Sequence, residues 1–174
     1  CPIQQGLADE NPDVDAVYRL TYPLPLDFKK GMNVALGEGA WSPFNSQNTY
    51  WYREAFPLLY LPAYCSFRMT DIWRSYVAQR IAWANGWSVL FHEATVWQER
   101  NQHNLLKDFE DEIPGYLNNF KICSELANLN IKGGKENMLD DLLTCYDMLT
   151  GKGFVGKEED ALVRNWCEDI SKVW

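Results

Sequence analysis

The stretch 68–86, R-M-T-D-I-W-R-S-Y-V-A-Q-R-I-A-W-A-N-G, constrains the fold of this chain more than any other segment. Thr70 is a candidate N-cap, Asp71 adds negative charge to the first turn, and Asn85-Gly86 supplies a left-handed stop. The apolar residues recur at helical spacing, at Trp73, Val77, Ile81 and Ala84. The sequence therefore predicts one helix with a continuous apolar stripe.

Asp71 is the candidate catalytic residue of this helix. The apolar segment 58–67 precedes it, so the carboxylate can be held rigidly at the rim of a sheet. A general base commonly occupies such a position. The residues alone leave open a structural alternative, in which the carboxylate only caps the helix.

Length and charge limit the classes of function. The 174 residues suit one domain or one half of a larger one. No apolar run approaches the roughly 18 residues of a membrane span. The formal net charge of −8 argues against nucleic acid and anionic membrane surfaces as partners. The chain opens at Cys1-Pro2 without an initiator Met, so we expect a processed product or an excised fragment.

Neither the cysteines nor the acidic residues form a recognised metal motif. The five cysteines contain no C-x-x-C pair, which argues against zinc, and their odd number leaves at least one free unless a partner chain pairs with it. A cluster near the N-terminus contains four carboxylates that offer oxygen ligands to a hard cation: Asp9, Glu10, Asp13 and Asp15. Because it lacks the EF-hand pattern, a solvated acidic loop is the preferred interpretation.

The remaining segments predict a mixed α/β architecture. Residues 1–13 are polar and turn-rich, and we expect no strand there. Strands are expected at 15–22, 33–36, 49–53 and 87–92, and a short helix or buried segment at 54–61. Helical patterns follow at 105–113, 116–129, 136–149 and 158–174, with a break at Pro114-Gly115. This tail is expected to be a helical buttress or an interaction surface.

Two polar stretches are candidate binding sites. Asn45, Ser46, Gln47 and Asn48 lie between aromatic clusters, and such side chains suit sugar hydroxyls. The alternative is a turn in which they bond their own backbone. His103, within E-R-N-Q-H-N, is a better candidate than His92 for a metal or phosphate contact, although a lone histidine is more often structural. Nucleotide-binding glycine motifs and the G-x-S-x-G motif are absent from the sequence.

Three stretches carry a resemblance to a known family. They are G-L-A-D-E-N-P-D-V-D-A-V-Y-R-L-T at 6–21, S-P-F-N-S-Q-N-T at 42–49, and D-I-W-R-S-Y-V-A-Q-R-I-A-W at 71–83, continued by W-Q-E-R-N-Q-H-N at 97–104. In this order and spacing they resemble the STELLO-like glycosyltransferases. The resemblance covers residues 1 to about 109, and beyond that only a general helical similarity is recognisable.

This resemblance implies a GT-A-like α/β fold with a mixed sheet. Residues 1–109 are then expected to form the acceptor-side half of the glycosyltransferase domain, and 110–174 a helical extension packed on it. The family's acidic motif, which holds Mn²⁺ or Mg²⁺, is expected upstream of Gly6 and outside this chain. The implied compartment is the Golgi lumen if the source is eukaryotic, and the implied ligands are a nucleotide-sugar donor and a carbohydrate acceptor.

The resemblance also implies roles for single residues. Asp71 would deprotonate the acceptor hydroxyl, and Arg74 would contact a phosphate or orient Asp71. Sugar hydroxyls would be held by Asn45, Gln47 and Asn48. His103 and Arg100 would approach the diphosphate or complete the metal shell. Arg19 would bind substrate or instead pair with the acidic loop 9–15.

Two competing hypotheses come from other classes of function. One is a non-catalytic glycosyltransferase-like scaffold that binds a polysaccharide-synthesis partner through its helical tail. The other is a carbohydrate-binding module built on the loop 45–48, which predicts sugar affinity without metal or nucleotide.

Overall fold

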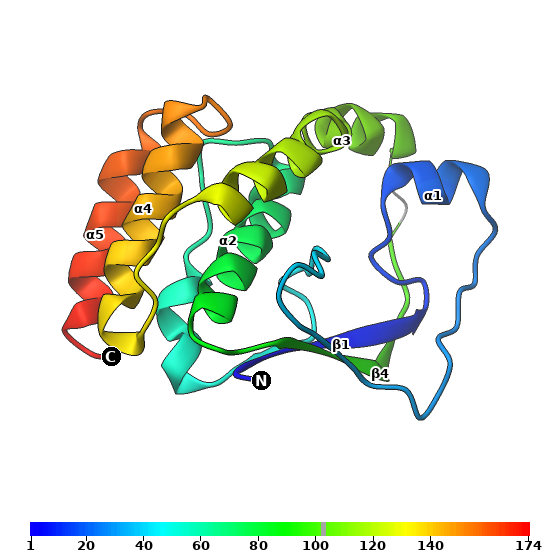
Figure 1. The fold of residues 1–174 in the computed structure, drawn as a ribbon. Helices are drawn as coiled ribbons and strands as arrows, with labels where there is room; N and C mark the ends of the chain where they lie inside the picture. The colour runs from blue at the N-terminus through cyan, green and yellow to red at the C-terminus, as the bar shows by residue number, and fades with distance from the viewer. Residues whose placement is uncertain (102–103) are drawn as a thin grey trace.

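The computed structural model describes residues 1–101 and 104–174 (Figure 1). Its strands are β1 (Ile3–Glu10), β2 (Val34–Leu36), β3 (Thr49–Trp51) and β4 (Val89–Gln98). Its α-helices are α1 (Ala16–Thr21), α2 (Thr70–Ala84), α3 (Leu105–Asn128), α4 (Met138–Gly151) and α5 (Glu159–Ser171). Short 3₁₀ helices are η1 (Arg53–Leu59), η2 (Phe67–Met69) and η3 (Lys135–Asn137). The chain is thus a mixed α/β protein with C-terminal helices.

The four strands form one mixed sheet in the order β2-β4-β1-β3. The central pair β1 and β4 is parallel, from Ile3 opposite Val89 to Glu10 opposite Gln98, and both outer pairs are antiparallel. In Figure 1 the helices lie above the sheet, and α1 lies near the carboxyl end of β1. Because the central strands are parallel, their carboxyl ends meet at one edge.

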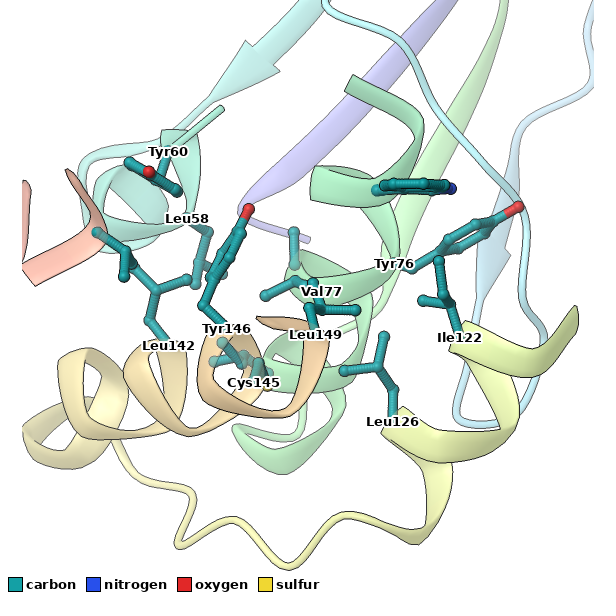
Figure 2. Close-up of a cluster of buried hydrophobic side chains, with 14 of the residues drawn as sticks. Leu58, Tyr60, Tyr76, Val77, Ile122, Leu126, Leu142, Cys145, Tyr146 and Leu149 are labelled. Carbon is teal, nitrogen blue, oxygen red and sulfur yellow. The ribbon is translucent and has the colours of Figure 1, made fainter. Parts of the chain in front are cut away.

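The predicted helix 68–86 is confirmed as α2, which lies at the centre of the core. Figure 2 shows Val77 of α2 facing a cluster of side chains from α3 and α4: Ile122, Leu126, Leu142, Cys145, Tyr146 and Leu149. Every residue from Trp73 to Gln79 is buried, so the polar side of the helix is enclosed as well. The core therefore surrounds α2 on all sides in its middle turns.

The ends of α2 differ in how well the sequence predicted them. Asn85 is the C-cap and Gly86 has a φ of 70°, as the expected left-handed stop requires. Thr70 is not the N-cap, because η2 leads directly into the helix and Met69 takes that position. The Thr70 hydroxyl instead donates to the carbonyl of Phe67 at 3.1 Å.

The N-terminal segment forms a strand that the sequence analysis did not predict. Residues 1–13 contain β1, which hydrogen-bonds to β3 on one side and β4 on the other. Gln5 is buried, and its amide donates to the carbonyls of Gly6 and Gln47. A polar side chain that is buried through hydrogen bonds adds nothing to a hydrophobic pattern. The alternation that would have predicted the strand is therefore missing.

The strand predicted at 15–22 is wrong, because this segment is α1. Asp15 caps the helix by accepting the Tyr18 N–H at 3.0 Å. The buried carboxylate of Glu112 accepts the N–H of Ala16 at 2.8 Å. Two helix N–H groups that would otherwise lack an acceptor are thus hydrogen-bonded. These bonds stabilise a helix in a segment whose alternating pattern is typical of a strand.

The break predicted at Pro114-Gly115 is also wrong, since α3 runs through it. Proline removes one backbone hydrogen bond from a helix, a loss that tertiary contacts can offset. Glu112 is bonded to Arg68 just before the proline, and Gly115 packs closely on Met69 just after it. The boundary expected at 109/110 lies within this helix, and the two-part division stays a prediction.

The other predicted elements are confirmed with shifted bounds. β2 and β3 are shorter than expected, η1 occupies the segment expected as a short helix, and β4 extends beyond 92 to Gln98. The two last helices lie where periodicity placed them. Among the described residues, no helix combines the length and apolarity needed to cross a bilayer.

Candidate functional site

Asp71 lies in the first turn of α2, partly buried against the loop 42–48. Its Oδ2 accepts the backbone N–H of Ser46 at 3.1 Å. Burial raises the pKa of the Asp71 carboxyl above its ordinary value, and the charge of Asp13 adds to the rise. The Ser46 N–H and the charge of Arg74 oppose it. A fixed carboxylate with a raised pKa at a helix start is suited to accept a proton.

Arg74 lies one turn further along α2 and is only 2% exposed. Its guanidinium carbon is 5.3 Å from the ring centre of Phe44 and 4.8 Å from that of Trp51. One terminal nitrogen donates to the carbonyl of Asn45 and to the hydroxyl of Ser46. Burial lowers the pKa of Arg74 to about 10, so it remains charged at neutral pH. This enclosed placement suits the orienting role rather than a phosphate contact.

The loop 45–48 is held by bonds of its own and by bonds to the sheet. Asn45 Oδ1 accepts the N–H of Gln47 at 3.1 Å, the bond that the turn interpretation expects. The Asn48 amide donates to the carbonyl of Leu7 and the hydroxyl of Thr95. Gln47 is exposed at the tip of the loop. The sugar-binding roles of these amides stay predictions.

Arg19 and Arg100 both bind the segment 11–14 between β1 and α1. Arg19 donates to Asn11 Oδ1 at 2.6 Å and to the carbonyls of Pro12 and Val14. Arg100 forms an ion pair with Asp13 at 2.5 Å. Arg19 therefore contacts the acidic loop through backbone carbonyls of the loop and the Asn11 side chain.

The acidic residues near the N-terminus are spread over several structural contacts. Asp9 accepts the Phe28 N–H and pairs with Lys30 at 2.5 Å, while Asp15 caps α1. Among the described residues, no group of three or more cysteine, histidine or acidic side chains is arranged to hold a metal ion. His103, the predicted metal ligand, lies outside the described residues.

The structure brings most of the predicted residues to one region. Ser46 connects the loop 45–48 to Asp71, and Asn48 connects it to β1 and β4. Asp13, whose charge acts on Asp71, is bonded to Arg100. The helix start and the polar loop, separate candidates in sequence, are therefore in direct contact.

A pocket of about 830 Å³ lies beyond the carboxyl ends of β1 and β4, where the sequence predicted no site. Its lining residues are Asp9, Glu10, Asn11, Leu24, Pro25, Asp27, Trp97, Gln98, Glu99 and Arg100. Three separate segments contribute, which the parallel pairing of β1 with β4 and the backbone bonds between Glu10 and Leu26 bring together. Open α/β sheets commonly bind ligands outside the carboxyl ends of their strands.

Comparison with known families matches residues 68–174 to the STELLO glycosyltransferases. The probable glycosyltransferase STELLO2 of Arabidopsis thaliana is 30% identical over 177 aligned residues, and STELLO1 of the same plant is 27% identical. Each alignment includes 98% of this chain, so the similarity extends through α4 and α5, beyond the portion recognised in the sequence. The chain spans 23% and 22% of the lengths of these relatives. The chain belongs to the STELLO glycosyltransferase family.

Proposed function

We propose that this chain forms the acceptor-side part of a GT-A-like glycosyltransferase, with Asp71 as the general base. The observation that carries the proposal is the placement of Asp71. Its carboxylate is fixed by the Ser46 N–H at the start of the buried helix α2, and burial raises its pKa. Membership of a glycosyltransferase family supports the reaction class.

In the proposed reaction Asp71 takes the proton from an acceptor hydroxyl as the hydroxyl oxygen attacks the anomeric carbon of the donor sugar. The bond between that carbon and the nucleoside diphosphate breaks, and the diphosphate leaves with its electron pair. A raised pKa brings the carboxylate closer to the pH at which it works, which makes it a better proton acceptor. Arg74 positions the loop that holds Asp71.

The donor is proposed to be a nucleotide sugar held with Mn²⁺ or Mg²⁺. The described residues do not fit a metal centre of their own. The cation site therefore belongs, in this proposal, to an acidic motif elsewhere in the full-length protein. The role proposed for Asp71 does not depend on any metal ligand in this chain.

The proposal is tested with Asp71→Asn in the full-length gene product. Donor binding is measured by calorimetric titration with UDP- and GDP-sugars in the presence of Mn²⁺, and transfer by release of the nucleotide. Loss of the base is expected to lower turnover by about 10²–10⁴-fold with donor affinity unchanged. Asp140→Asn is the matched control, because the Asp140 side chain is 61% exposed and, within the part of the chain that the structure describes, pairs with the similarly exposed Lys132. Equal turnover in Asp71→Asn and the parent protein would exclude the assignment.

One observation favours the second candidate, a scaffold that binds a partner protein through its helices. The outer side of α3 presents a row of exposed apolar side chains at helical spacing: Leu106, Phe109, Ile113, Leu117 and Phe120. Phe120 is 86% exposed. A complex that depends on this row, formed by a protein that binds no nucleotide sugar, would support the scaffold over the enzyme.

A further inference from the structure

The pocket at the carboxyl ends of β1 and β4 is built on ordered backbone. Glu10, the last residue of β1, exchanges two backbone hydrogen bonds with Leu26, at 3.1 and 2.9 Å. Asp9 accepts the N–H of Phe28 at 2.9 Å. These bonds hold the segment 24–28 against the end of the strand, so the wall of the pocket that it forms is fixed.

The lining combines one large aromatic surface with many hydrogen-bonding groups. Trp97 is 68% exposed, an unusual state for the largest apolar side chain. Around it lie amides from Asn11 and Gln98 and exposed carboxylates from Asp27 and Glu99. An aromatic face suits the apolar face of a sugar ring, and amides with carboxylates suit its hydroxyls.

The charge of the pocket selects against anions. Among the described lining residues, four carry carboxylates, of which Asp9 is paired with Lys30, and the cation Arg100 is bonded to Asp13. A diphosphate or a uronic acid would meet a net negative wall, which is unfavourable at close range. A metal ion is not favoured either, because the described residues converge on no such site. A neutral, hydroxyl-rich ligand fits both conditions.

We propose that this pocket is the subsite for a neutral saccharide acceptor, with Trp97 as its stacking surface and Asp27 as a hydroxyl partner. The proposal rests on the proposed transferase function and specifies its acceptor. Arg100 lines the pocket and pairs with Asp13, and the charge of Asp13 contributes to the raised pKa of Asp71. The carboxylates of the lining also disfavour binding of the anionic donor in this subsite.

The test is calorimetric titration of the full-length gene product with maltohexaose, mannohexaose and xylohexaose, and with the anionic hexagalacturonate. At least one neutral oligosaccharide is expected to bind, and more tightly than hexagalacturonate. Trp97→Ala and Asp27→Asn are each expected to weaken that binding by about tenfold or more. Tyr50→Ala is the matched control, since Tyr50 is 54% exposed on β3 and outside the pocket lining.

Three results would overturn the subsite: no binding of any neutral oligosaccharide, tighter binding of hexagalacturonate, or an equal loss in Tyr50→Ala and Trp97→Ala. Failure of the subsite is distinct from failure of the base. Asp71→Asn is expected to keep saccharide affinity and lose turnover. Trp97-dependent binding together with full turnover in Asp71→Asn would keep the subsite and exclude the base.

Discussion

Asp71 is a residue whose charged form the fold disfavours. Burial raises its pKa above the ordinary 3.8, so its contribution to stability is fully present below that value and is lost as the pH rises through the folded-state pKa. Asp71→Asn is therefore expected to increase the free energy of unfolding near neutral pH, while the difference disappears in acid. Urea denaturation of the variant and the parent protein, near neutral pH and in acid, measures the difference in the free energy of unfolding. A variant that is less stable than the parent at neutral pH would contradict the expectation.

Glu159 is a second buried carboxylate, and its role is structural. It is 0% exposed and accepts the N–H groups of Ala63 and Tyr64 and the hydroxyl of Tyr60. Glu159→Gln places an amide NH₂ among these donors and leaves one without an acceptor. We expect a loss of about 1–3 kcal/mol in the free energy of unfolding, measured by urea denaturation.

The neighbouring Glu158 provides the control for this prediction. Glu158 is exposed, and Glu158→Gln removes the same charge without disturbing buried donors. Equal losses in Glu158→Gln and Glu159→Gln would show that charge, rather than the buried hydrogen bonds, determines the effect.

At the scale of elements, the contact between β1 and the loop 45–48 depends on a glycine. A Cβ at Gly6 would overlap the Asn48 amide and lie 2.8 Å from the Thr95 hydroxyl. Gly6→Ala is therefore expected to displace the loop and to cost about 1–3 kcal/mol. Faster amide hydrogen exchange at Ser46, whose N–H binds Asp71, would report the displacement.

Gly37→Ala is the matched control, because a Cβ at Gly37 has no heavy atom within 4 Å. That variant is expected to be neutral or to gain up to about 1 kcal/mol through the unfolded chain. Unchanged exchange at Ser46 in Gly6→Ala would show that the loop tolerates the added methyl group.

The elements that the sequence predicted well are those whose apolar residues alone define them. The α2 helix is one, because Trp73, Val77 and Ile81 give both its period and its buried face. Strand β1 is the opposite case, since Gln5 is buried through hydrogen bonds to partners more than forty residues away. Helix α1 depends on Glu112, ninety-six positions distant. Long-range polar contacts of this kind leave no local pattern.

In the candidate site, too, local features were predicted from the sequence and long-range contacts were not. The sequence separately indicated Asp71 and the loop 45–48, and the structure joins them through Ser46. The pocket was not predictable, because the parallel pairing of β1 with β4 brings Trp97 to Glu10, and the bridge between Glu10 and Leu26 brings Asp27 there. Because β1 was not predicted from the sequence, the pocket that β1 lines was not predicted either.

At the scale of the whole molecule, the exposed apolar row on α3 has the character of an interface. Leu106, Leu117 and Phe120 are 71%, 64% and 86% exposed, and soluble monomers rarely present such contiguous apolar side chains. Relatives of this chain are more than four times its length, since it spans 23% and 22% of them. We therefore expect the row to be covered by other parts of the full-length protein.

Hydroxyl-radical footprinting of the 174-residue chain and of the full-length gene product tests this expectation. Leu117 and Phe120 are expected to become protected in the longer protein, whereas Tyr50, 54% exposed on β3, provides the internal reference. Protection that requires an added partner protein would instead assign the row to the scaffold function. Equal labelling of the row in both proteins and in the partner's presence would contradict the expectation.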